Sequence, residues 1–436
     1  MRSPVLAFSL FAASMAPTLV AGVPVPTTDV ERQHVARAAG SIPDLPIGTM
    51  VKRATDAGTA GGNAFSGNSN DASGGSVGNQ STGTTAQSNT GSNFGGTGAA
   101  TSSGSATGGN GDGFGPGGNA YSGAAGPSYG GEVYNESAAG ITNTGGSRST
   151  SDVPGVGGTS ASGPATGGNA GSTRPRKRAY DAYTAGGNAY SGNSGDTDSG
   201  SVTNDGGSGR IQNINATNDA PVFGAGPPVV AQPKSTTGDA TGGRGDGFGP
   251  GGNAHSGTAG SSNGGDVDNF TTGNIDSTGT TTRSNVAQAG GQSTSGNSKG
   301  GDAAGSNRRN RKRSTDPYTA GGNAYSGNTG NTDGGNVYND AGTGAVSNTG
   351  GNAAGTGGAN KSGTASGGSG NGFGPGGNSY TGSTGTSRGG DVQNFGGSVT
   401  NAPVGAGAAA VGANRGGGGG ANTTGASKGG NAFYSS

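Results

Sequence analysis

The 19-residue stretch GGNAYSGNTGNTDGGNVYN, residues 321–339, is one copy of a module that recurs six times in this sequence. Its consensus is G-G-N-A-Y-S-G-x-x-G-x-x-x-G-G-x-V-x-N, and every copy has the same length. The copies span residues 61–79, 117–135, 186–204, 251–269, 321–339 and 376–394. The fifth position is Phe, Tyr or His in every copy, and the seventeenth is always Val. Repetition in a fixed register indicates a repeat architecture.

Large apolar side chains are too sparse in this chain to fill a conventional core. Glycine supplies 105 of 436 residues, and Leu, Met, Cys and Trp do not occur after residue 50. Glycine disfavours helices and loses more conformational entropy on folding than any other residue. Because apolar burial falls several-fold short of the cost of ordering such a chain, we expect no globular core. The composition predicts a mostly disordered chain of low-complexity glycine-rich repeats.

Two β-structures remain as alternatives to disorder. In the first, each module forms a short antiparallel hairpin in which the aromatic residue at position 5 faces the valine at position 17. Such a pair stabilises weakly, and an isolated hairpin is marginal in water. In the second, the modules stack as a thin, glycine-rich parallel β-solenoid, because Gly-Gly recurs at positions 1 and 14 of the module.

The amino terminus has the pattern of a secretory signal peptide. Arg2 precedes an apolar run over residues 5–13, and small residues near Ala21 suit cleavage. Pro17 interrupts the apolar stretch, which is too short to span a bilayer. We therefore expect residues 1–21 to be removed and the mature chain to be extracellular or cell-wall associated, without a membrane anchor.

Paired basic residues stand at the start of each large repeat, which holds two modules. The pairs are Lys52-Arg53, Lys177-Arg178 and Lys312-Arg313, and Lys-Arg occurs nowhere else in the sequence. Exposed, flexible segments of this kind are preferred sites of proteolysis. We predict cleavage by a Kex2-like processing protease after each pair. The expected parts are a pro-segment (22–53) and repeat units 1 (54–178), 2 (179–313) and 3 (314–436).

This layout resembles that of the fungal Kex2-processed repeat proteins, which are secreted as precursors. In that family the released products include surface-coating peptides, pheromones and cyclic peptide toxins. The resemblance implies a structural or cell-wall role for the three units, with cell-wall polysaccharide or self-association as the partner. The alternative is a secreted effector or a peptide signal that acts on a host or another cell.

Six N-glycosylation sequons are compatible with secretion. They begin at Asn79, Asn135, Asn215, Asn269, Asn360 and Asn422. The tripeptide Arg244-Gly245-Asp246 matches an adhesion motif, but the sister units differ there, which indicates chance. Lys and Arg number 24 and Asp and Glu also number 24, so the balance gives no reason to expect a nucleic-acid partner. With no cysteine and two distant histidines, we expect no enzyme, catalytic centre, metal site or cofactor.

Overall fold

The structure is a computed structural model, and the residues it describes lie within one unit, residues 55–436. The described ranges are 59–90, 93–112, 115–144, 152–171, 183–214, 232–247, 249–278, 285–303, 319–348, 352–370, 374–401 and 414–432. These residues form short β-strands joined by extended segments and turns. Among them there is no helix long and apolar enough to cross a membrane.

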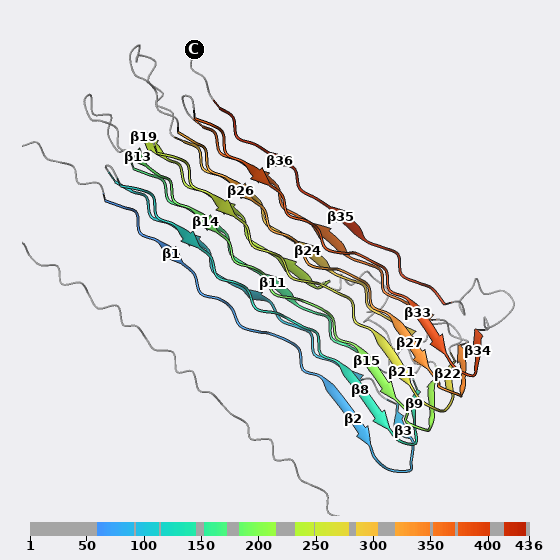
Figure 1. The fold of residues 1–436 in the computed structure, drawn as a ribbon. Coiled ribbons are helices and arrows are strands. Elements are labelled where there is room, and N and C mark those ends of the chain that lie inside the picture. Colours follow the sequence, from blue (N-terminus) through green and yellow to red (C-terminus); the bar gives the residue numbers. More distant parts are fainter. Residues whose placement is uncertain are drawn as a thin grey trace, which may run out of the picture. The chain divides into compact units, whose positions relative to one another are not determined.

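The first three turns of the chain, here called coils 1 to 3, each contain the same five recurring strands and one additional short strand (Figure 1). Coil 1 contains β1 (Ala64–Phe65), β2 (Val77–Ser81), β3 (Gln87–Asn89), β4 (Asn93–Phe94), β5 (Thr101–Ser102) and β6 (Ala106–Thr107). Coil 2 contains β7 (Ala120–Tyr121), β8 (Val133–Ser137), β9 (Gly140–Thr144), β10 (Asp152–Val153), β11 (Thr159–Ala161) and β12 (Ala165–Thr166). Coil 3 contains β13 (Tyr183–Thr184), β14 (Ala189–Tyr190), β15 (Val202–Asp205), β16 (Arg210–Ile214), β17 (Lys234–Thr236) and β18 (Ala240–Thr241).

Coils 4 to 6 contain the same five recurring strands, with additional short strands in coils 4 and 5. Coil 4 contains β19 (Asp246–Gly247), β20 (Ala254–His255), β21 (Val267–Phe270), β22 (Ile275–Thr278), β23 (Asn285–Val286), β24 (Gln292–Thr294) and β25 (Ser298–Lys299). Coil 5 contains β26 (Ala324–Tyr325), β27 (Val337–Asp340), β28 (Ala345–Asn348), β29 (Asn352–Ala353), β30 (Ala359–Lys361) and β31 (Ala365–Ser366). Coil 6 contains β32 (Ser379–Tyr380), β33 (Val392–Phe395), β34 (Ser398–Asn401), β35 (Ala421–Thr423) and β36 (Ser427–Lys428).

Equivalent strands of successive coils pair in parallel and form five six-stranded sheets, here called ladders 1 to 5. Ladder 1 is β1-β7-β14-β20-β26-β32, ladder 2 is β2-β8-β15-β21-β27-β33, ladder 3 is β3-β9-β16-β22-β28-β34, ladder 4 is β5-β11-β17-β24-β30-β35 and ladder 5 is β6-β12-β18-β25-β31-β36. Three additional two-stranded pairs join β4 to β10, β23 to β29 and, antiparallel, β13 to β19. The described part of the chain is therefore a parallel β-solenoid of six coils, with one 19-residue module in each coil.

The prediction of a mostly disordered chain is wrong. The hairpin alternative is also wrong, because Tyr121 and Val133 of one module belong to different ladders, in which each pairs with its counterparts in the neighbouring coils. The parallel solenoid, the second alternative, describes the observed arrangement. The prediction from composition considered only how many apolar side chains could fill a core. Much of this interior is instead filled by hydrogen-bonded backbone.

Glycine backbones meet in the interior, where the segments that precede ladder 1 hydrogen-bond directly to the segments that follow ladder 5. Eleven N–H to carbonyl bonds of 2.7–2.9 Å link twelve glycines, here called the axial glycine chain. In order these are Gly62, Gly109, Gly118, Gly168, Gly187, Gly243, Gly252, Gly301, Gly322, Gly368, Gly377 and Gly430. A Cβ on Gly118 would lie 2.1 Å from the Gly62 carbonyl oxygen, so this approach requires glycine. Because these buried backbone groups are paired, this part of the interior needs little apolar volume.

Small and branched side chains fill the rest of the interior in columns. Val133, Val202, Val267 and Val337 pack together in ladder 2, and each is almost fully buried. A second cluster holds the buried isoleucines of ladder 3, Ile141, Ile211 and Ile275, with Ala341 and Val346. A third consists of alanines from ladders 1 and 5: Ala106, Ala120, Ala165, Ala189, Ala240 and Ala254. β-Branched residues suit such strands because their side chains pack on the pleated surface.

The asparagine at module position 19 forms a hydrogen-bonded column through the whole solenoid. This asparagine column consists of Asn79, Asn135, Asn204, Asn269, Asn339 and Asn394. Each side-chain amide donates to the side-chain oxygen of the next residue over 2.7–2.9 Å. The four inner asparagines have no exposed surface. Stacked amides satisfy each other's donors and acceptors, which makes their burial tolerable.

Candidate interaction surfaces

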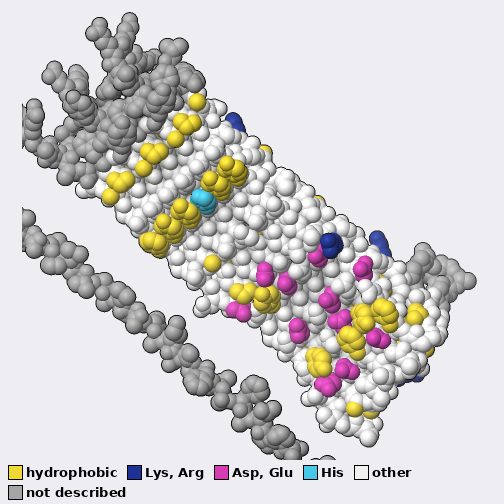
Figure 2. All heavy atoms as spheres, viewed as in Figure 1, with side chains coloured by type: hydrophobic (Ala, Val, Ile, Leu, Met, Phe, Trp, Pro, Cys, Tyr) yellow, Lys and Arg dark blue, Asp and Glu magenta, His cyan; other side chains and the backbone are white. Residues whose placement is uncertain are grey.

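Ladder 1 carries a row of stacked rings, one from each coil, here called the aromatic stack. It consists of Phe65, Tyr121, Tyr190, His255, Tyr325 and Tyr380. Neighbouring ring centroids lie 4.5–5.0 Å apart, and the ring planes differ by 3–8°. Figure 2 shows this row as a band of yellow side chains interrupted by the cyan histidine. The in-register strands of ladder 1 fix the spacing, because parallel neighbours lie about 4.8 Å apart.

The geometry of the stack determines which ring surfaces are available. Inner rings cover one another's faces and present their edges to the outside, whereas Phe65 and Tyr380 each have one face without a ring neighbour in the stack. Their exposed fractions are 72% and 53%. Burial also lowers the pKa of His255, which favours the neutral imidazole between Tyr190 and Tyr325. The stack is thus an apolar band whose uncovered ring faces are at its two ends.

A second exposed row follows the outward positions of ladder 2 and combines aromatic and acidic side chains. The rings of Phe270 and Phe395 lie 5.4 and 5.3 Å from that of Tyr338, at tilted angles. Figure 2 shows acidic side chains in magenta around yellow side chains in this region of the surface. Partial burial, then the nearby Asp266, raises the pKa of Asp268 to about 6. The row therefore changes charge near neutral pH.

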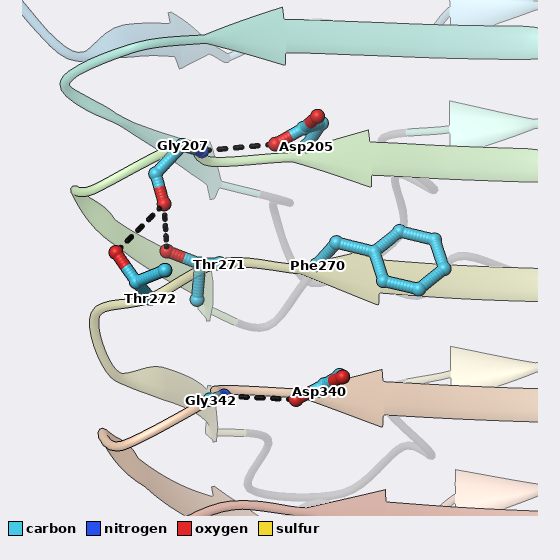
Figure 3. Close-up of a pocket in the computed structure, with 7 residues that line it drawn as sticks. All are labelled: Asp205, Gly207, Phe270, Thr271, Thr272, Asp340 and Gly342. Atoms are coloured by element: carbon cyan, nitrogen blue, oxygen red, sulfur yellow. Dashed lines mark hydrogen bonds between the residues drawn. The ribbon is translucent and has the colours of Figure 1, made fainter.

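A shallow pocket lies among the turns that connect ladders 2 and 3 in coils 3, 4 and 5 (Figure 3). Its lining residues are Asp205, Gly207, Phe270, Thr271, Thr272, Asp340 and Gly342. The carboxylates of Asp205 and Asp340 accept the amide hydrogens of Gly207 and Gly342, at 3.0 and 2.8 Å, respectively. Both glycines have φ of 54°, a left-handed conformation that favours glycine. These carboxylates stabilise their own turns, and the pocket is best explained as a product of turn geometry.

The sequence-predicted processing residues Lys52, Arg53, Lys177, Arg178, Lys312 and Arg313 lie outside the described residues. The ends of the described ranges nevertheless bracket two of the pairs. Lys177-Arg178 falls between Gly171, after the last strand of coil 2, and Tyr183, which begins coil 3. Lys312-Arg313 falls between Ala303, after coil 4, and Thr319, before coil 5. Both pairs are thus located in connections between coils.

The predicted glycosylation sites differ in how far the fold buries them. Asn135, Asn269 and Asn360 are buried, and each side-chain amide nitrogen donates a hydrogen bond. A glycan on such a nitrogen has no room in this fold. Asn79 is half-buried and donates to Asn135, Asn422 is exposed, and Asn215 lies outside the described residues.

Two further motifs contribute no site in the described residues. No group of three or more His, Cys, Asp or Glu side chains within these ranges is placed to hold a metal ion. In the tripeptide at 244–246, Arg244 is exposed, while Asp246 begins β19 and pairs with Thr184 in the antiparallel connection. The tripeptide is therefore partly incorporated into a strand.

Sequence reasoning missed two columns of asparagine, one that points inward at module position 19 and one on the outward side of ladder 1 at position 3. Position 19 is asparagine in all six modules, but this pattern alone did not predict a hydrogen-bonded column. The asparagine at position 3 is equally constant. Its side-chain oxygen accepts the backbone N–H of the same position in the next coil, as between Asn63 and Asn119 and between Asn188 and Asn253, each over 2.8 Å. A polar residue kept in register across all modules was the signal that could have revealed both columns.

Comparison with known protein families, with curated protein sequences and with solved structures finds no match.

Proposed function

We propose that this chain is the precursor of a secreted structural material, which a Kex2-like protease divides into three units of two coils each. The observation that carries the proposal is the position of Lys177-Arg178 and Lys312-Arg313 between coils 2 and 3 and between coils 4 and 5. Each expected unit then contains two complete passages through ladders 1 to 5. Cleavage at these points removes no strand of a ladder, which suits a protease that needs an exposed connection.

Parallel pairing would still hold the units together after such a cut. β7 pairs with β14 across the first connection, and β20 pairs with β26 across the second. The asparagine column also continues there, from Asn135 to Asn204 and from Asn269 to Asn339. We therefore expect the cleaved chain to remain one six-coil particle until these contacts are broken.

The surface suits a structural role outside the cell. The aromatic stack presents one ring edge per coil on the same face, so a partner can make the same contact several times along that face. Such weak, repeated contacts give strong overall attachment when the spacing matches. Cell-wall polysaccharide has the hydroxyl chemistry to bind these groups, and association between copies is the second possibility.

Mass spectrometry of the secreted protein tests the proposed processing. We expect new amino termini at Ala54, Ala179 and Ser314. Arg178→Ala should leave units 1 and 2 joined while the cut after Arg313 persists. Recovery of only the intact chain from about residue 22 onward would contradict the proposal. Size-exclusion chromatography without denaturant then shows whether the cleaved units stay together.

A second candidate function is that of a secreted effector or peptide signal. The ordered fold favours it, because a folded unit with paired backbone groups resists further proteolysis. Location distinguishes the two candidates. A structural material is retained in the wall and extracted only by strong denaturants, whereas an effector is recovered in soluble form from the medium.

A further inference from the structure

The two end coils are built like the inner coils, although each has a neighbour on one side only. Coil 1 and coil 6 both carry the full module and strands of all five ladders. Repeat proteins normally end in atypical capping repeats, and uncovered strand edges pair readily with other chains. Among the described residues no such cap covers either end. Within the described residues, each end therefore exposes a surface of the kind that is buried between neighbouring coils elsewhere in the solenoid.

The asparagine column ends in complementary groups. In the described structure Asn79 donates its amide to Asn135, and no described residue donates to the Asn79 side-chain oxygen. At the other end, Asn394 accepts from Asn339, and its amide nitrogen has no acceptor among the described residues. An Asn394 donor meets an Asn79 acceptor if coil 1 of one copy follows coil 6 of another.

Glycines on coil 1 leave room that no described residue of the chain fills. The glycine at module position 7 lies against the carbonyl of the same position in the preceding coil, so a Cβ on Gly123 would approach the Gly67 oxygen to 2.2 Å. Gly67 itself has nothing within 4 Å of an added Cβ, and the same is true of Gly62 and Gly75. The space beside Gly67 can therefore accept a carbonyl group from a second copy of the chain. The equivalent carbonyl at position 7 of coil 6 belongs to Gly382.

Apolar surface is exposed at both ends in matching positions. Phe65 is 72% exposed and Tyr380 53% exposed, while the four rings between them are half-buried. Val77 and Val392 are partly buried, whereas the valines between them in ladder 2 are almost fully buried. Placing coil 1 against coil 6 would continue both columns and cover this surface.

We propose that the two ends of the solenoid bind each other, so that copies of this chain assemble head to tail into filaments in the register of the internal coils. Phe65 of one copy stacks on Tyr380 of the next, and the asparagine column and ladders 1 to 5 run on without interruption. The interface joins two different surfaces, and such heterologous contacts form open filaments when the rotation does not close a ring. The inference does not rest on cleavage between the coils, because coils 1 and 6 contain the same described strands with or without those cuts.

A substitution at Gly67 separates assembly from folding. Gly67→Val places a side chain in open space within one copy but against the Gly382 carbonyl of the next. The matched control is Gly78→Val in the same coil. Gly78 also has open space, but its position points outward, where its ladder 2 partner in coil 2 is Tyr134. Filaments are measured by electron microscopy and sedimentation, and folding by circular dichroism and denaturant unfolding.

We expect the wild-type chain and Gly78→Val to form filaments, and Gly67→Val to raise the concentration needed for assembly by about tenfold or more. The measurement is made on the secreted chain both before and after treatment with a furin-type protease. Unfolding midpoints should be the same for all three proteins. The proposal is overturned if the wild type forms no filaments in either preparation, or if Gly67→Val assembles as well as Gly78→Val.

Discussion

Residues 268 and 269 are neighbours in β21, and they represent two different kinds of column. Asn269 points inward, and its column is asparagine in all six coils. Asp268 points outward, and its partners in the same ladder are Thr203 and Tyr338. The inward position is fixed because each amide must match the amide above and below it, whereas the outward position meets solvent. Identity within a column thus reflects hydrogen bonding through the stack.

The glycines show the same difference between inside and outside. Gly257, at module position 7, packs against the backbone of Gly192, and its column is glycine in every coil. Gly78 occupies an outward position, and its partner in the next coil is Tyr134. A glycine in this protein is therefore structural when it faces another backbone and replaceable when it faces solvent.

The largest expected effect comes from filling an inward glycine. A Cβ on Gly257 would lie 2.1 Å from the Gly192 carbonyl oxygen, a backbone atom that cannot move without shifting the whole coil. We expect Gly257→Val to lower the free energy of unfolding by more than about 4 kcal/mol, or to prevent folding. Urea denaturation followed by circular dichroism measures the effect.

Gly78→Val serves as the control and should change stability by less than about 0.5 kcal/mol, as expected for a surface position. If the two substitutions had equal effects, the distinction between inward and outward glycines would fail.

An intermediate effect is expected from interrupting the asparagine column. Asn204 accepts from Asn135 over 2.9 Å and donates to Asn269 over 2.8 Å, and all three are fully buried. Asn204→Ala removes the donor to the buried Asn269 oxygen and leaves the Asn135 nitrogen with only its bond to Asp152, so we expect a loss of about 2–4 kcal/mol in the free energy of unfolding. Thermal and denaturant unfolding would measure it.

Asn79→Ala is the matched control, because Asn79 is half-buried at the end of the column and makes one bond within it. We expect it to cost less than about 1 kcal/mol. A loss as large as that of Asn204→Ala would show that burial within the column is not what makes the bonds important.

The spacing of the modules in the sequence gives the register of this fold, whereas the composition led to a wrong prediction of disorder. Ala64 pairs with Ala120, which is the spacing between the modules that begin at residues 61 and 117. Ladders 3 to 5 lie outside the module, and polar partners such as Ser160 and Ser235 gave no apolar pattern to find. The expectation of disorder failed because the entropic cost of glycine was weighed against a small net contribution from hydrogen bonds, whereas glycine lets two backbones approach closely and bond through the whole interior. The sequence identified the aromatic positions, but it suggested that each ring pairs with a valine in a hairpin and did not predict a stack of rings.

The smallest expected effect belongs to the outward column and depends on pH. Partial burial and Asp266 raise the pKa of Asp268 to about 6 in the folded chain, above the ordinary value of 3.8. The folded state therefore holds this proton more tightly than the unfolded state, and stability falls as the pH rises from about 4 to about 6. Below that window the carboxyl is protonated in both states and carries no penalty. Because the side chain is partly solvated, screening limits the penalty at pH 7 to about 1 kcal/mol.

Asp268→Asn removes this charge while keeping the shape of the side chain. We expect the variant to be more stable than wild type by about 1 kcal/mol at pH 7 and equally stable at pH 3.5, as measured by urea midpoints across the range. Asp268→Glu keeps the charge and should keep the pH dependence. The comparison between columns predicts that neither substitution disturbs the amide stack, because Asn269 points to the opposite face of the same strand. If Asp268→Asn instead lowered stability at pH 7, the outward carboxylate would have a stabilising partner, and its column would resemble the inward ones.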